Sequence, residues 1–131
     1  AIGYALNWPD RAGLPVARLD LARAGRLDFS APDMRRYPAL ELAQQVMTMG
    51  GVAGAVFNAA KEVALDQFIA GQIRFTDMAA IVADTLEIYA ATADMGKVPA
   101  SLADVLETDT EARVLAGQVG RKRHRVNSGA A

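Results

Sequence analysis

The sequence contains no cysteine, a single histidine and few aromatic residues. Without cysteine the chain forms neither disulfides nor thiolate metal sites, and this absence fits a reducing compartment. Aromatic residues make up 6% of the chain, so there is little material for base stacking, and His124 alone could supply imidazole chemistry. We find no secretory leader and no apolar run near roughly 18 residues, and therefore expect a cytoplasmic location and no membrane partner.

The sequence also lacks the short motifs that point to a particular reaction. It has no Gly-x-Gly-x-x-Gly loop, no Walker motif, no Gly-x-Ser-x-Gly elbow and no metal-ligand spacing of Cys and His. A di-metal helical bundle would need Glu-x-x-His pairs, and the one histidine, His124, lies in the C-terminal tail. The net charge of −1 predicts no general affinity for nucleic acid. From the residues alone we expect no catalytic residue, no cofactor-binding residue and no metal ligand.

What the chain does have is a long apolar helical pattern in its middle, between Gly50 and Asp77. With 131 residues, of which 52% are hydrophobic, the chain can bury the core of one domain. The pattern predicts a helix over residues 52–70 with little solvent-facing surface. A helix of that kind belongs at the centre of a bundle.

Helices are predicted on both sides of this segment. Pro38 suits a first helical turn and Gly50 suits a helix end, which together predict a helix over residues 38–49. Thr76 is predicted to cap a third helix, with Asp77 in its first turn and on its solvent side.

The C-terminal part is predicted to contain a short helical turn over residues 101–106 and a last helix. Thr108 and Glu111 have capping-box spacing, and Gly120 ends the regular pattern. Short connections between the helices favour an antiparallel four-helix-type bundle over residues 39–119. The tail, residues 120–131, is predicted to be disordered. Its basic residues could bind nucleic acid or acidic lipid, but without interleaved aromatics we favour a solvated tail; they are Arg121, Lys122, Arg123 and Arg125.

The N-terminal residues follow a different pattern. Ile2 and Leu6 could share one side of a short helix that ends before Pro9. Polar and apolar residues alternate over residues 26–29, which is the best strand candidate in the chain. One strand cannot form a sheet alone, so it either joins a sheet outside this sequence or is irregular. Residues 30–38 read as a linker. The expected fold class is mainly α, a bundle preceded by a linker and a small α/β remnant.

Three polar residues interrupt the first half of the apolar central segment: Asn58, Lys61 and Glu62. Asn58 and Glu62 are four residues apart and share a face, so they could form a site facing a ligand. Alternatively, they form a buried network in which each polar group has a hydrogen-bond partner, and this network fixes the linker or a neighbouring helix end. We favour the structural network.

The dipeptide Trp8-Pro9 is the other candidate site. It could line a pocket, but a lone tryptophan more often anchors a core or an interface. We favour the anchoring role.

Several stretches taken together resemble a known family. In order they are Ala1-Ile-Gly-Tyr-Ala-Leu-Asn-Trp-Pro-Asp-Arg, Arg18-Leu-Asp-Leu, Arg26-Leu-Asp-Phe-Ser-Ala-Pro-Asp, Arg36-Tyr-Pro-Ala-Leu, Phe57-Asn-Ala-Ala-Lys-Glu-Val-Ala and Gly71-Gln-Ile-Arg-Phe-Thr-Asp. This combination is similar to the C-terminal third of the 1-deoxy-D-xylulose 5-phosphate reductoisomerase family and covers about residues 1–119. Any one of these stretches alone would be weak evidence for the resemblance.

The resemblance implies an activity for the whole enzyme. Members convert 1-deoxy-D-xylulose 5-phosphate to 2-C-methyl-D-erythritol 4-phosphate in non-mevalonate isoprenoid biosynthesis, using NADPH and Mg or Mn. They are commonly homodimers and are the target of fosmidomycin. The family's metal-binding, substrate-binding and nucleotide-binding residues would all lie before Ala1. The resemblance therefore implies that this chain has no catalytic residue and binds no cofactor by itself.

The resemblance also implies a division of the chain. Residues 1–29 would be the end of the central catalytic domain, residues 30–38 the linker and residues 39–119 the bundle. Its partners would be the N-terminal and central domains of the same enzyme. The family generally has Asn-Ala-Ala-Asn-Glu where this chain has Lys61 in place of the second Asn. If that Asn satisfies a buried group in the family, Lys61 must reach solvent or a carboxylate.

Two hypotheses of different classes follow. In the first, the chain completes the active-site cleft of the reductoisomerase structurally and is inactive alone. In the second, it is a free-standing helical interaction module that binds a partner protein through residues 1–29.

Overall fold

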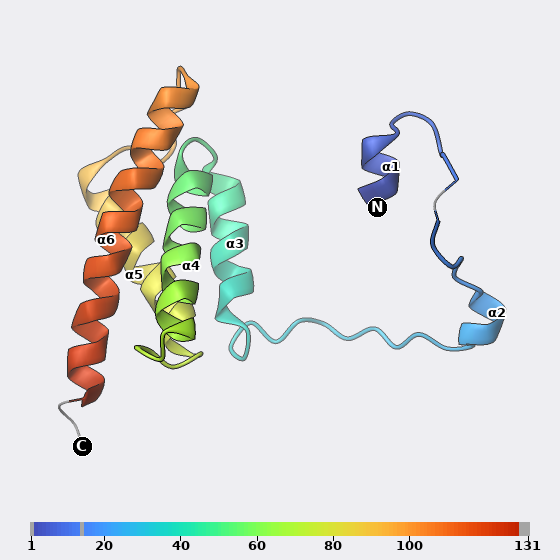
Figure 1. Cartoon of the computed structure of the whole chain (residues 1–131), viewed down its shortest axis with the longest axis horizontal. Helices are drawn as coiled ribbons and strands as arrows, with labels where there is room; N and C mark the ends of the chain where they lie inside the picture. Colours follow the sequence, from blue (N-terminus) through green and yellow to red (C-terminus); the bar gives the residue numbers. More distant parts are fainter. Residues whose placement is uncertain (1, 14, 129–131) are drawn as a thin grey trace. The chain divides into compact units, whose positions relative to one another are not determined.

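The computed structural model describes residues 2–13 and 15–128, with side chains as far as Arg123. It divides into two compact units, Ala1–Ala31 and Pro32–Ala131. The regular elements of the described residues are all helices (Figure 1): α1 (Ile2–Leu6), α2 (Leu21–Ala24), α3 (Pro38–Met49), α4 (Ala53–Ile69), α5 (Asp77–Thr92) and α6 (Leu102–Ser128). The mainly α fold class is confirmed.

Helix α4 is the centre of the second unit and packs against α3, α5 and α6. Its inward positions are small or β-branched, which allows the neighbouring helices to approach closely; Ala53, Val56, Ala59, Ala60 and Ala64 are buried. The buried stripe of α5 covers one side of it, with Ile81, Val82, Thr85, Leu86 and Tyr89. Residues Ala112, Ala116 and Val119 of α6 pack on another side and complete the core. The prediction of a central apolar helix is confirmed.

The start of α5 differs from the prediction. Thr76 makes no capping hydrogen bond through its side chain. Asp77 is buried, and its carboxylate accepts a hydrogen bond from the backbone N–H of Arg74 at 2.9 Å. The carboxylate points back toward the preceding loop, because it accepts hydrogen bonds there from both the backbone N–H and the guanidinium of Arg74.

The C-terminal segments form one continuous helix rather than a turn, a helix and a tail. Thr108 is buried within α6, and the capping box lies earlier, between Ser101 and Asp104. The Ser101 hydroxyl accepts from the Asp104 N–H at 3.3 Å, and the Asp104 carboxylate accepts from the Ser101 N–H at 3.2 Å. The helix continues through Gly120 to Ser128, so the prediction of a disordered tail is wrong for residues 120–128. Residues 129–131 of that tail lie outside the described residues.

The first unit contains α1, α2 and loops. The predicted strand over residues 26–29 does not form in the described structure, and the correction has a simple cause. A strand needs a partner that accepts and donates its backbone hydrogen bonds, and no described segment offers one. No residue of the first unit that the structure describes is buried, and Phe29 is 90% exposed.

None of the described helices is both long enough and apolar enough to span a bilayer.

Candidate functional site

The polar residues of α4 form a connected group on the surface of the bundle. The Asn58 amide donates to Glu62 Oε1 at 3.1 Å, and the Lys61 ammonium donates to Asn58 Oδ1 at 3.0 Å. Lys61 is exposed. Because Asn58 is also exposed and Glu62 is only half-buried, the expectation of a buried network is wrong. The three side chains lie together because they are three and four residues apart on one helix.

Arg113 of α6 links this group to a second helix, and it was not identified from the sequence. Its guanidinium donates to Glu62 Oε2 at 2.6 Å and to Asp109 Oδ2 at 2.6 Å. Hydrogen bonds from Arg113, and then from Asn58, hold the pKa of Glu62 below its usual value. Hydrogen bonds to Asp109 and Glu62 in turn raise the pKa of Arg113. The i,i+4 spacing of Asp109 and Arg113 was visible in the sequence, but the contact with Glu62 depends on how α4 and α6 pack.

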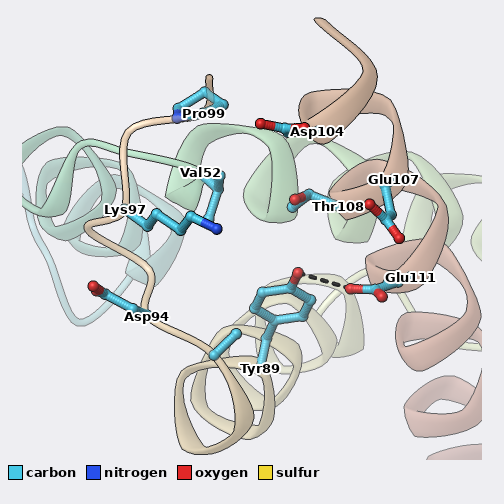
Figure 2. Close-up of a pocket in the computed structure, with 10 residues that line it drawn as sticks. Val52, Tyr89, Asp94, Lys97, Pro99, Asp104, Glu107, Thr108 and Glu111 are labelled. Atoms are coloured by element: carbon cyan, nitrogen blue, oxygen red, sulfur yellow. Dashed lines mark hydrogen bonds between the residues drawn. The ribbon is translucent and has the colours of Figure 1, made fainter. Parts of the chain in front are cut away.

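A polar cleft of about 440 Å³ lies at the end of the bundle where α5 leads into α6 (Figure 2). Its lining residues are Val52, Tyr89, Ala93, Asp94, Lys97, Pro99, Asp104, Glu107, Thr108 and Glu111. The Tyr89 hydroxyl donates to Glu111 Oε2 at 2.9 Å, and Figure 2 shows Lys97 and Thr108 directed toward the same space. Burial is the main cause that raises the pKa of the Tyr89 phenol above its usual value, so the phenol stays protonated at neutral pH.

This cleft can hold hydrogen-bonding groups, but its lining residues do not form a catalytic arrangement. They include no histidine, cysteine or serine that could act as a nucleophile or imidazole base. Among the residues that the structure describes, no group of three or more His, Cys, Asp or Glu side chains is placed to hold a metal ion. The acidic residues of the cleft therefore do not fit a metal centre.

The Trp8-Pro9 element belongs to the first unit, and its peptide bond is cis. Trp8 packs edge-to-face on Tyr4 with ring centroids 5.3 Å apart, and Arg11 lies over the same tyrosine ring at 4.5 Å. Trp8 nevertheless remains 70% exposed. It does not anchor a core within the described residues, and its role at an interface stays a prediction.

Comparison with known proteins identifies the family. A family sequence profile described as the DXP reductoisomerase C-terminal domain matches residues 1–115. The chain belongs to the 1-deoxy-D-xylulose 5-phosphate reductoisomerase family. It is 57% identical over 116 residues to the reductoisomerase of Jannaschia sp. (strain CCS1) and 54% identical over 123 residues to that of Ruegeria sp. (strain TM1040).

These matches cover most of this chain but a minor part of the relatives. They include 88% and 94% of the chain, against 30% and 31% of the two reductoisomerases. The chain thus spans about 30% of the length of the curated relatives it matches.

Solved reductoisomerase structures share the fold. The Zymomonas mobilis enzyme in complex with NADPH matches with a TM-score of 0.77 and 42% identity, covering 91% of this chain and 30% of that chain. A reductoisomerase in complex with NADPH, fosmidomycin and magnesium matches with a TM-score of 0.75 and 32% identity, covering 92% of this chain and 30% of that one.

Proposed function

We propose that this chain is the C-terminal structural portion of an NADPH-dependent reductoisomerase that converts 1-deoxy-D-xylulose 5-phosphate to 2-C-methyl-D-erythritol 4-phosphate in non-mevalonate isoprenoid biosynthesis. The observation that carries this proposal is the match of residues 1–115 to the family's C-terminal domain, together with 57% identity to a named reductoisomerase. In this role the chain supports the catalytic part of the enzyme and is inactive alone.

NADPH and a divalent metal, Mg or Mn, supply the hydride and the Lewis acid of the whole enzyme. NADPH and magnesium are named in the related structures. The described residues of this chain do not fit a metal ion, since no suitable cluster of ligands is present among them. We propose that the parts of the enzyme outside this chain hold both groups, and we derive no reaction step from its residues.

The exposed apolar side chains of the first unit support the proposed domain division. Eight large hydrophobic side chains of the described residues 2–29 are exposed to water; they are Ile2, Leu6, Trp8, Val16, Leu19, Leu21, Leu27 and Phe29. Apolar exposure on this scale marks a surface that another part of a protein covers. We propose that residues 1–29 complete the central catalytic domain, that residues 30–38 are the linker and that residues 39–119 are the bundle.

The proposed partners are the N-terminal and central domains of the same enzyme, and the whole enzyme is proposed to be a homodimer in the cytoplasm. The alternative is a free-standing interaction module that binds a partner protein through residues 1–29, and the exposed apolar side chains of those residues would suit it as well. The test below separates the two: turnover by the chimaera supports the reductoisomerase portion, and a folded chimaera without turnover favours the module.

The test uses a full-length chimaera in which this chain replaces the matched C-terminal region of the Jannaschia sp. enzyme. With 1-deoxy-D-xylulose 5-phosphate, NADPH and magnesium, we expect the chimaera to oxidise NADPH at a rate comparable with its parent. The parent enzyme truncated at the same junction is the control and should be inactive, as should the 131-residue chain alone. A folded chimaera without turnover would contradict the proposal, and turnover by the chain alone would contradict its inactivity.

A further inference from the structure

Four large apolar side chains lie exposed where α4 ends and α5 begins. We call this group the end patch; it consists of Leu65, Phe68, Ile69 and Phe75. The first three are spaced three and four residues apart and so share a face of α4. Phe75, in the loop before α5, packs edge-to-face on Phe68 with ring centroids 5.7 Å apart. The loop thus extends the apolar face of α4 beyond its last turn.

Burial within the bundle does not explain this group. Ile69 is 73% exposed and Phe75 is 71% exposed. Aromatic and aliphatic side chains gathered in one exposed patch are typical of an interface, because clustered rings give a large contact area with little loss of rotamer entropy.

The end patch lies at the end of the bundle where the linker enters. Helix α3 begins at Pro38 and runs antiparallel to α4, so its first turn lies beside the last turns of α4 (Figure 1). A small apolar hollow of about 150 Å³ shows this adjacency, since Ala39, Ala64 and Met78 are among its lining residues.

We propose that the end patch is the surface through which the bundle docks on the catalytic part of the enzyme outside this chain. This inference rests on the proposed function. More than two thirds of each curated relative lies outside the matched region. In the proposed division residues 1–29 belong to that catalytic part, so the linker ties it to the bundle, and the eight residues 30–37 reach at most ~29 Å when extended. A tether of this length gives a high effective concentration at the linker end, so even a modest apolar patch there is sufficient for stable docking.

The opposite end of the bundle provides a matched comparison. Leu102 and Leu106 are also exposed and lie one turn apart on α6, but they belong to the end where α5 leads into α6. The linker does not enter there. Leu102 is 72% exposed and Ile69 is 73% exposed, so solvent reaches the two side chains to nearly the same extent when the catalytic part is absent.

The experiment measures thiol accessibility in the full-length chimaera described above. Ile69→Cys and Leu102→Cys are made separately, and a maleimide labels each folded protein and its urea-unfolded form, with the site resolved by peptide mass spectrometry. We expect folding to slow labelling of Ile69→Cys at least roughly tenfold more than labelling of Leu102→Cys, because docking removes the first thiol from solvent. This chain adds no native cysteine to the chimaera, and the peptide readout distinguishes the introduced thiol from any in the parent portion.

The outcomes separate the two proposals. Rapid labelling of Ile69→Cys in a chimaera that turns over substrate overturns the docking surface and leaves the proposed function intact. Protection in a chimaera without turnover supports docking and contradicts the function. Protection that disappears on dilution, in step with dissociation of a dimer, shows that a second copy covers the end patch and also overturns the inference.

A second variant tests the energetic role of the patch. Phe75→Ser should make the bundle of the chimaera unfold at lower urea than the catalytic part, because the interface that couples them is weakened. Leu106→Ser should leave a single transition. If both variants behave alike, the end patch is not the docking surface.

Discussion

At the scale of single residues, Arg113 shows how one side chain joins helices that are distant in the chain. It bridges Glu62 of α4 and Asp109 of its own helix, while the neighbouring Lys61 donates a hydrogen bond to the Asn58 amide oxygen. Both Arg113 and Glu62 are close to 40% exposed, at 39% and 44%. Solvent therefore screens the pair, and its contribution to stability is small.

Replacing Arg113 with methionine should lower the urea midpoint of unfolding slightly at pH 7 and hardly at pH 3. The pKa of Glu62 is held below its usual value mainly by the Arg113 hydrogen bond, so this stabilisation is present above the unfolded pKa of about 4.5 and is lost as the pH falls through the folded pKa. Lys61→Asn is the control and should change stability by less than ~0.5 kcal/mol at either pH. An Arg113→Met effect that is equal at both pH values would contradict the assignment.

Asp77 differs from Glu62 because its side chain is buried. It accepts from the Arg74 backbone N–H, and the Arg74 side chain adds a contact that is largely exposed to water. The hydrogen bond from the Arg74 side chain is the main cause that lowers the pKa of Asp77, and the backbone bond acts in the same direction.

Asp77→Ala should destabilise the bundle by roughly 1–2 kcal/mol at pH 7, through loss of the hydrogen bonds from the Arg74 side chain and backbone N–H to the carboxylate. Because the folded pKa is depressed, this contribution is present above about pH 4 and should shrink as the solution becomes more acidic. Urea unfolding between pH 7 and pH 2.5 measures it. Glu87→Ala, an exposed carboxylate on the same helix, is the control. A loss that does not decrease in acid would argue against the pKa assignment.

At the scale of elements, α6 passes through a glycine that reads as a helix end in the sequence. Gly120 is buried, and a Cβ at this position would collide with the Gln67 side chain of α4. Gln67 Oε1 is itself buried and has no hydrogen-bond partner among the described residues. Glycine lowers the helix propensity at this position, but a larger residue would disturb the contact between α4 and α6.

A double-mutant cycle tests this explanation. Gly120→Ala should be neutral or destabilising in the natural chain, because Gln67 must move. In a Gln67→Ala background it should stabilise by up to ~1 kcal/mol through helix propensity. Gly117→Ala, whose Cβ would make only ordinary contact with Arg121, should stabilise equally in both backgrounds. Equal effects at Gly120 in the two backgrounds would show that Gln67 is not the constraint.

At the scale of the whole molecule, the two units differ in how much they bury. All residues of the two core clusters lie between Val46 and Val119 in the second unit. The described residues of the first unit include none that is buried. A helix of five residues and one of four cannot be stable through their own hydrogen bonds.

Deleting residues 1–31 should therefore leave the Tm of the bundle unchanged. The measurement is thermal unfolding by circular dichroism of the 131-residue chain and the shortened chain. In the longer chain, amide hydrogens of residues 2–31 should exchange rapidly while those of α4 remain protected. A clear drop in Tm on deletion would show that the first unit stabilises the bundle.

Much of the architecture could be read from the order of residues alone. The bounds of α3, the central position of α4 and the buried stripe of α5 follow from helical periodicity, glycine ends and a proline start, which are local properties. The family motifs likewise lie in the residues themselves. These features need no knowledge of which surfaces meet.

Only the tertiary structure decided which polar groups meet and that α6 continues past Gly120. The Glu62–Arg113 contact, the inward turn of Asp77 and the passage of α6 through Gly120 each depend on how one segment packs on another. The strand expected over residues 26–29 is absent for the same reason, since strand pairing requires a partner outside the segment. Local periodicity determines a helix and its apolar face, but contacts between residues far apart in the chain exist only once the chain is packed.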